Sequence, residues 1–127
     1  MKLKINIEQK MILYVKDSLK ELVIDNSIKQ VFDENSEEYK ELCNMYGHDI
    51  KFERKDFPNE YDQIILKKAS KHMQEVQKST IEKIVEVIKT SFLKGNSSVV
   101  EFGGYIINPK DFCAIKVDKF NVNISKE

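Results

Sequence analysis

The residue types best suited to chemistry gather at positions 43–49, where Cys43, Tyr46, His48 and Asp49 lie close together in sequence. A zinc site needs three or four ligands in a tetrahedron, and the Cys-x4-His spacing supplies two. A nucleophilic cysteine needs a histidine beside it and a lowered pKa, which this pattern does not provide. We therefore predict no metal site and no catalytic residue here. Cys43 is expected to pack at a helix end, and His48 to lie in a solvated loop.

The other candidate groups are more isolated still. Cys113 alternates with Ile115 and Val117, which places it on the buried face of a predicted strand. Glu37 and Glu41 stand one helical turn apart, but in so acidic a segment they are expected to be hydrated surface. No glycine belongs to a phosphate-binding loop, the four positions being Gly47, Gly95, Gly103 and Gly104. We therefore expect no cofactor and a protein that is not an enzyme.

Charge is unevenly distributed along a chain that carries 21 basic and 21 acidic residues. The first uneven region is an acidic segment that could dock into a basic groove of a protein partner, formed by Asp33, Glu34, Glu37, Glu38 and Glu41. The second is a flank of a predicted helix with four lysines, Lys67, Lys71, Lys78 and Lys89. Such a row could follow a phosphate backbone. Neighbouring glutamates at pairing distance and the lack of an aromatic platform disfavour nucleic-acid binding.

Composition limits the class of protein. A chain of 127 residues with 33% charged and 41% hydrophobic residues is predicted to be one soluble domain, 1–127. No apolar run approaches the length of a membrane span, and the first residues lack the hydrophobic stretch of a signal peptide. Two lone cysteines fit a reducing compartment, so we expect a cytoplasmic protein with no membrane partner. A single arginine, Arg54, among many Lys, Ile and Asn residues is typical of an AT-rich genome, such as that of a low-GC bacterium or its phages.

The sequence predicts an α+β fold with helices in its first three quarters. Residues 2–7 could form a short strand, with Leu3, Ile5 and Ile7 on one face, or lead directly into the first helix. An apolar stripe at helical spacing predicts a helix from 7 to about 24, formed by Ile7, Met11, Ile12, Val15, Leu19, Leu22 and Val23. Further helices are predicted over 27–32, over 37–46 with Ser36 as cap and Gly47 at its left-handed end, and over 59–94 with Asn59 as cap. Alternation over 50–54 predicts a short strand.

The last quarter predicts an antiparallel meander of three or four strands. Gly103-Gly104 suits a two-residue hairpin turn between strands 99–102 and 105–107. That turn would pair Phe102 with Tyr105 and Val100 with Ile107. Strands over 112–117 and from about 120 to 124 are expected to continue the same sheet.

The predicted helix over 59–94 conflicts with the size of the chain. At ~1.5 Å per residue it would be about 54 Å long, whereas a compact chain of this size is roughly 36 Å across. Polar residues near Ser79 could mark a break, but without Gly or Pro we expect a continuous helix. Its excess length would then contact a second copy of the chain, through Leu66, Met73, Val76, Ile84 and Ile88.

These features favour a non-enzymatic protein–protein interaction module that acts as a homodimer. An inhibitor of a host protein, encoded by a phage or mobile element, is compatible with the small size and acidic segment. One alternative is sequestration of a small anionic ligand at a dimer interface, with Arg54, Tyr105 and Lys110 as contacts. The other is nucleic-acid binding through the lysine flank.

Overall fold

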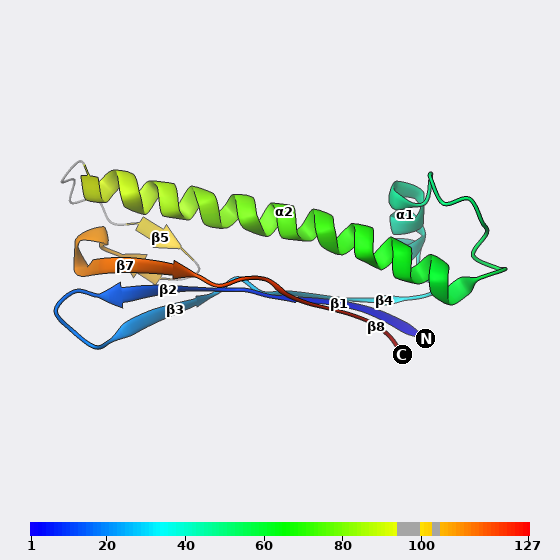
Figure 1. Cartoon of the computed structure of the whole chain (residues 1–127), viewed down its shortest axis with the longest axis horizontal. Helices are drawn as coiled ribbons and strands as arrows, with labels where there is room; N and C mark the ends of the chain where they lie inside the picture. The colour runs from blue at the N-terminus through cyan, green and yellow to red at the C-terminus, as the bar shows by residue number, and fades with distance from the viewer. Residues whose placement is uncertain (94–99, 103–104) are drawn as a thin grey trace. The chain divides into compact units, whose positions relative to one another are not determined.

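The chain has an α+β fold, as the sequence predicted. A computed structural model describes the backbone of residues 1–93, 100–102 and 105–127, and the side chains of 1–90, 106, 108 and 110–127. In chain order the elements are β1 (Lys2–Glu8), β2 (Lys10–Val15), β3 (Glu21–Asp25), β4 (Ile28–Asp33), α1 (Glu37–Tyr46), α2 (Pro58–Leu93), β5 (Val100–Phe102), β6 (Tyr105–Ile107), the 3-10 turn η1 (Pro109–Asp111), β7 (Phe112–Val117) and β8 (Asn121–Lys126) (Figure 1).

The chain forms two compact units, each with a part of α2. Unit 1 consists of Met1–Glu8, Ser27–Glu75 and Phe120–Glu127. Unit 2 consists of Gln9–Asn26 and Val76–Lys119. The expectation of one domain stays a prediction, because α2 contributes to both units.

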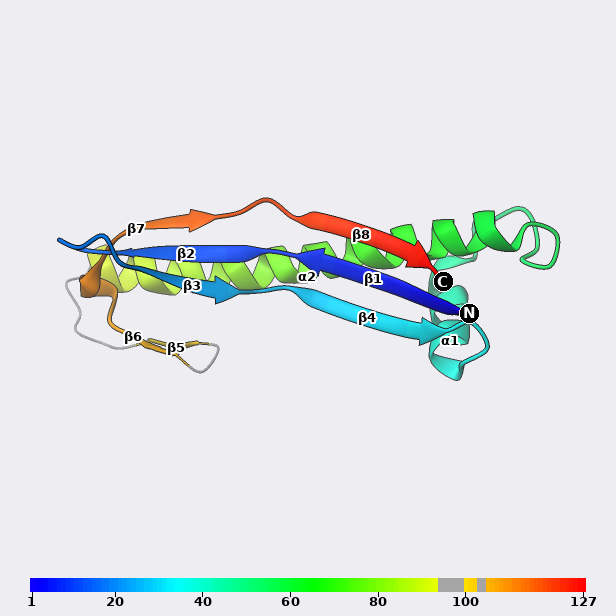
Figure 2. The ribbon, with the colours of Figure 1, turned by 90° about the horizontal axis from the view of Figure 1, so that it is seen from below.

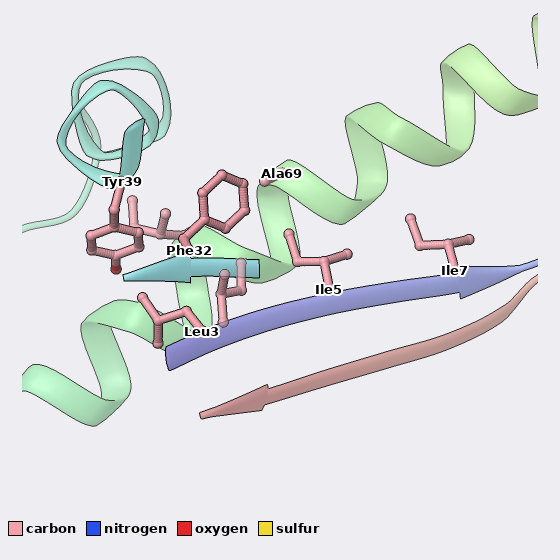
Figure 3. Packing of buried hydrophobic residues seen from close by; sticks show 8 residues of the cluster. Leu3, Ile5, Ile7, Phe32, Tyr39 and Ala69 are labelled. Carbon is pink, nitrogen blue, oxygen red and sulfur yellow. The ribbon is translucent and has the colours of Figure 1, made fainter. Parts of the chain in front are cut away.

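Unit 1 contains a three-stranded antiparallel sheet in the order β4-β1-β8 (Figure 2). Leu3, Ile5 and Ile7 alternate along β1, so all three side chains point to the same face and are fully buried. They meet Phe32 of β4, Tyr39 of α1, and the apolar stripe of the first part of α2 (Figure 3). The stripe consists of Ile65, Leu66 and Ala69.

Unit 2 also contains a three-stranded antiparallel sheet, in the order β3-β2-β7. Met11 lies opposite Ile24, and Leu13 opposite Leu22 and Ile115, which places these side chains on one face. That face packs against the second part of α2 through Ile81, Ile84 and Ile88. Each unit is therefore a sheet covered by a helix, two layers enclosing one core.

The predicted helices over 7–24 and 27–32 are wrong, because both segments form strands. Apolar residues are so dense near the N-terminus that they match a helical period as well as an alternating one, and the β-branched Ile and Val side chains favour strands. A turn also interrupts the segment, with Asp17 at a positive φ of 57°. The N–H of Val15 donates to the carbonyl of Lys20 at 3.0 Å and closes a β2–β3 hairpin.

Helix α1 has the predicted bounds, and its N-cap is confirmed. Ser36 Oγ accepts the Tyr39 N–H at 3.2 Å. Gly47 ends the helix, but at φ −93° rather than in the predicted left-handed conformation. Glycine is needed there for space, since a Cβ would lie 2.5 Å from the Cys43 carbonyl oxygen and 2.6 Å from Tyr61 Oη.

The predicted strand over 50–54 is absent from the structure. These residues form part of an irregular connection between α1 and α2. Phe52 packs edge-to-face on Phe57, with ring centroids 5.7 Å apart, and on Tyr61, at 6.2 Å. Arg54 turns toward α2, and these side-chain contacts fix the segment without strand pairing.

The C-terminal strands exist, but they do not form one meander. β5 and β6 pair in the predicted register, Phe102 with Tyr105 and Val100 with Ile107, while Gly103 and Gly104 lie outside the described residues. β7 pairs with β2 and β8 with β1. The meander prediction failed because it assigned the β2 segment to a helix and did not pair the possible strand over 2–7, which the structure confirms as β1, with the C-terminal strand.

Helix α2 is continuous over its 36 residues, as expected, but it begins at Pro58 rather than after Asn59. The polar residues near Ser79 do not break it. Gln77 is buried, and its Nε2 donates to the Asn26 carbonyl at 2.8 Å. Thr80 Oγ1 donates back to the Val76 carbonyl of the same helix at 3.0 Å.

Most of the predicted dimer contact is buried inside the chain. Leu66 packs in the core of unit 1, and Ile84 and Ile88 pack in the core of unit 2. Met73 is half-buried against the unit 1 core, and Val76 alone of the five is exposed, at 50%. Leu66, Ile84 and Ile88 therefore bury most of their apolar surface in contacts within the chain, and a dimer contact through these positions stays a prediction.

The placement of Ile84 predicts how its truncation changes stability. Ile84→Ala should lower the free energy of unfolding by about 2–5 kcal/mol, because it leaves a cavity in an intrachain core. Urea unfolding should show the same loss at every protein concentration. Val87→Ala, at an exposed position of the same helix, is the control and should change stability little. A loss that grows on dilution would instead place Ile84 at a subunit interface.

Candidate functional site

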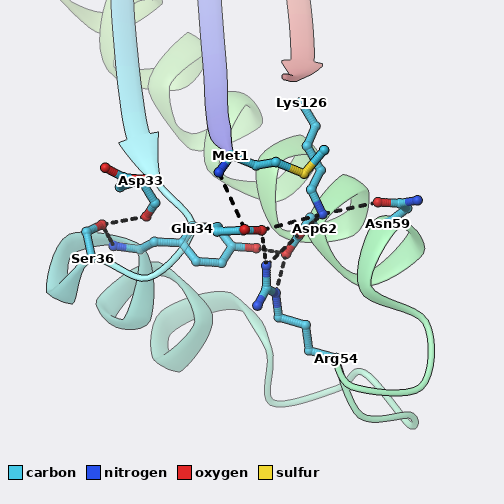
Figure 4. A network of polar contacts seen from close by, with 9 residues as sticks. Met1, Asp33, Glu34, Ser36, Arg54, Asn59, Asp62 and Lys126 are labelled. Atoms are coloured by element: carbon cyan, nitrogen blue, oxygen red, sulfur yellow. Dashed lines mark hydrogen bonds and ion pairs between the residues drawn. The ribbon is translucent and has the colours of Figure 1, made fainter.

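A buried carboxylate organises the polar side of unit 1. Asp62 lies in the first turns of α2 and is 1% exposed. Arg54 binds it with two donors, Nε at 2.8 Å from Oδ1 and Nη2 at 3.1 Å from Oδ2. Lys126 Nζ donates to Oδ2 at 2.8 Å, and the hydroxyl of Tyr39 donates to Oδ1 (Figure 4). One carboxylate therefore connects α1, α2, β8 and the α1–α2 connection.

A second carboxylate, Glu34, completes this ion cluster. Arg54 Nη2 lies 3.2 Å from its Oε2, Lys126 Nζ 3.9 Å from the same oxygen, and the amino group of Met1 3.5 Å from Oε1. Lys126 Nζ also donates to Asn59 Oδ1 at 3.1 Å. Buried charges persist when they are paired and hydrogen-bonded in this way.

The cluster holds Asp62 ionised and Tyr39 protonated. Burial alone would raise the pKa of Asp62, but hydrogen bonds from Arg54, Lys126 and Tyr39 outweigh it and hold the pKa below its ordinary value. Burial, and then the bond to Asp62, raises the pKa of the Tyr39 phenol. A carboxylate with a lowered pKa and occupied oxygens is a poor general acid or base. We interpret this cluster as structural.

The sequence contains a pattern that could have identified Asp62 as a buried carboxylate with a cationic partner. Asp62 occupies a position on the apolar stripe of α2, one helical turn before Ile65 and Leu66. A charged residue on a buried stripe requires a partner of opposite charge. The only arginine, Arg54, was instead assigned to an anionic ligand.

The feature of unit 2 that could bind another molecule is a groove between β7 and α2. Its first hollow has a volume of about 260 Å³ and is lined by Val85, Ile88, Lys89 and residues 112–115. The adjoining hollow, about 530 Å³, is lined by Gln9, Lys78, Ile81, Glu82, Val85, Glu86 and Val117. Val85 lines both hollows, and we name them together the β7–α2 groove. Its floor is apolar, and its charged residues come from α2.

The strand beside this groove has an open edge. β7 pairs with β2 on one side, and no other strand of the described residues pairs with it. Figure 2 shows β7 as the outer strand of its sheet. An open edge presents backbone N–H and C=O groups that can pair with another strand. The groove thus combines apolar surface with hydrogen-bonding groups.

The structure divides the predicted acidic segment. Glu34 belongs to the ion cluster, and Asp33 is exposed at the end of β4. Glu37, Glu38 and Glu41 are exposed on α1, where Glu37 pairs with Lys40 at 3.2 Å. Three of the five residues therefore form an accessible acidic face of α1.

The residues proposed to bind an anionic ligand belong to different units. Arg54 of unit 1 is occupied by Asp62 and Glu34. Lys110 is exposed in unit 2, and the side chain of Tyr105 lies outside the described residues. This arrangement gives no support to that alternative.

The lysine flank is divided between the two units. Lys67 and Lys71 are exposed in unit 1, and Lys78 and Lys89 line the groove in unit 2. Lys78 Nζ lies 4.0 Å from Glu82, an ion pair that the spacing predicted.

The reactive residue types also remain separate. Cys43 is half-buried, and burial raises the pKa of its thiol, while Asp49 pairs with Lys68. Cys113 is exposed rather than buried as predicted, because the β2–β7 register shifts beside it. Within the described residues, no group of three or more His, Cys, Asp and Glu side chains could hold a metal ion.

Comparison with models of protein families, with curated proteins and with solved structures finds no match for this chain. None of the described helices combines the length and apolar character needed to cross a membrane. The proposals below therefore depend on the geometry alone.

The ion cluster predicts that Asp62→Asn lowers the free energy of unfolding by an amount that depends on pH. At pH 7 the variant should lose about 3–5 kcal/mol of unfolding free energy, because it leaves the partly buried Arg54 and Lys126 without their anionic partner. Because the pKa of Asp62 is lower in the folded chain than in the unfolded chain, ionised Asp62 stabilises the fold at pH values above its unfolded pKa, near 3.9. This stabilisation is lost as the pH falls through the folded-state pKa. The deficit should therefore be full at pH 5–7 and shrink in more acidic solution.

Urea unfolding of wild type and variant across this pH range measures the effect. Glu53→Gln, which removes an exposed ion pair with Lys55, is the control and should match wild type closely. A deficit that stays constant with pH would contradict the ionised assignment of Asp62.

Proposed function

We propose that this chain is a non-enzymatic protein-binding module that holds its partner in the β7–α2 groove. The observation that carries this proposal is an apolar hollow next to an unpaired strand edge within one unit. Apolar surface supplies affinity, and the strand edge supplies directional hydrogen bonds.

The side chains of β7 support this choice. Natural proteins protect open edges with charged side chains such as lysine, with proline, with β-bulges or with covering segments. In β7 the bulge lies beside Cys113, at the start of the strand, and the lysine is Lys116. On the groove side β7 presents Phe112, Ile115 and Val117, none of them charged, and Val117 is 41% exposed. The exposed charge of this strand is Lys116, whose neighbours in sequence line the groove.

A second candidate surface is the acidic face of α1. Glu37, Glu38 and Glu41 are exposed and could dock into a basic groove, as an inhibitor of a nucleic-acid-binding protein would. This surface lies in unit 1 and the β7–α2 groove in unit 2, so substitutions can test them separately.

Two exposed valines give a matched test of the groove. Val117 lies in the groove, and Val87 lies on α2 outside its lining residues, at 41% and 47% exposure respectively. Val117→Glu should reduce capture of the partner by roughly tenfold or more, because partner binding would bury the new charge. Val87→Glu should capture it as wild type does. The measurement is photo-crosslinking in lysate of the source organism, quantified by mass spectrometry.

The acidic face supplies the contrasting variant, in which Glu37, Glu38 and Glu41 are all replaced by Gln. Loss of capture by this triple variant alone would assign binding to α1. Equal capture by all variants would reject both surfaces. If the wild type captures no protein specifically, the proposed function itself fails. Thermal unfolding of each variant checks that the fold is retained.

A further inference from the structure

We infer that the β7–α2 groove binds an extended peptide segment, which adds to β7 as an antiparallel fourth strand of the unit 2 sheet. The inference rests on the proposed function and specifies the form, direction and side-chain pattern of the partner. Its argument starts from the hydrogen-bond directions along β7.

The backbone groups of β7 alternate between β2 and the open edge. The N–H of Asp118 donates to the Lys10 carbonyl at 2.9 Å, so position 118 points toward β2. Directions alternate along an antiparallel strand, so Lys116 and Ala114 also point toward β2. The N–H and C=O groups of Ile115 and Val117 therefore point outward, where a residue opposite each can form two hydrogen bonds.

The side chains of the same two residues face the groove. Ile115 packs against the unit 2 core, and Val117 lines the second hollow with Ile81. Directly opposed residues in an antiparallel pair have their side chains on the same face, about 4.5–5.5 Å apart at Cβ. The peptide residues opposite Val117 and Ile115 would thus enter the hollows beside Val85. The residue between them would face the other side of the sheet, where polar side chains are tolerated.

Charge at the two ends of the groove favours one direction. Glu82 and Glu86 line the hollow at the Val117 end, and Lys89 lines the other. Lys78 pairs with Glu82, which leaves Glu86 to attract a cation. A peptide with a basic N-terminal flank and an acidic C-terminal flank would meet opposite charges in the antiparallel direction.

A second copy of β7 meets these requirements less well. Paired antiparallel to itself, β7 would bring its C-terminal flank to Lys89. That flank carries Lys116 and Lys119 against one acid, Asp118. Its excess positive charge would oppose Lys89, so the favoured occupant is a segment of a different protein with apolar residues two positions apart.

A synthetic peptide tests the inference without the natural partner. The probe is acetyl-Lys-Thr-Val-Thr-Ile-Thr-Glu-amide, whose Val would lie opposite Val117 and whose Ile would lie opposite Ile115. Fluorescence anisotropy of the labelled peptide should show saturable binding. Amide hydrogen exchange should slow at Ile115 and Val117 on binding, whereas Ala114 and Lys116, already paired with β2, should change little.

Methylation of the peptide backbone supplies the matched control. N-methylation of the Val and Ile removes the N–H groups that face β7 and should weaken binding roughly tenfold or more. The same modification of the central Thr removes an N–H that faces solvent and should cost much less. Equal losses from the two modifications would overturn strand addition.

A chain variant provides the reciprocal test. Val117→Pro removes one outward N–H and leaves the hydrogen bonds to β2, a position that an edge strand tolerates for proline. It should weaken peptide binding while circular dichroism and urea unfolding stay close to wild type. If it unfolds the chain, the N-methyl peptides still decide the question.

The remaining outcomes separate this inference from the proposed function. If Val117→Glu abolishes partner capture but the exchange of Ile115 and Val117 stays unchanged by peptide, the module binds through the groove without adding a strand. If both amides are protected in the free chain and the protection is lost on dilution, the occupant of the edge is a second copy. Either result overturns the inference.

Discussion

The apolar stripe of α2 is the constraint on which both units depend. In a helix of 36 residues such a stripe must be covered, because each apolar side chain that is exposed to water adds an unfavourable free energy of hydration. Its first part is covered by β4-β1-β8 and its second part by β3-β2-β7. The length that suggested a dimer is covered by sheets of the same chain.

Polar residues on this stripe specify which strands α2 meets. Asp62 binds Arg54, Tyr39 and Lys126, and these bonds favour the packing in which α1, β8 and the α1–α2 connection meet at its carboxylate. Gln77 bonds to the backbone of Asn26, just after β3. Leaving a buried polar group without its hydrogen-bond partner costs more free energy than an apolar contact at the same position gains. These hydrogen bonds therefore favour the packing in which both groups are paired. Both groups lie at positions that a purely apolar stripe would fill with aliphatic residues.

The groove follows from covering three strands with one helix. In unit 2 Met11 and Leu13 of β2 are fully buried beneath α2, while Val117 at the outer strand is only partly covered. In unit 1 the ion cluster and α1 add cover to the sheet. Both units therefore place one helix over a three-stranded sheet, and among the described residues the outer strands β7 and β8 each pair on one side only.

The sequence by itself determined the features that depend on neighbouring residues. Ser36 and the acids after it specify the start of α1, and the β5–β6 register follows from its turn. The absence of Gly and Pro after Pro58 keeps α2 continuous. These are local effects of hydrogen bonding and backbone freedom, which short patterns express directly.

Only the tertiary structure decided the remaining features. Residues 7–24 match a helical and an alternating period equally, and pairing of β1 with β8 and of β2 with β7 resolved that ambiguity in favour of strands. The same pairing placed Lys126 on Asp62 and left the edge of β7 open beside α2. Contacts between residues a hundred positions apart depend on the summed burial of the whole chain, and no local pattern records them.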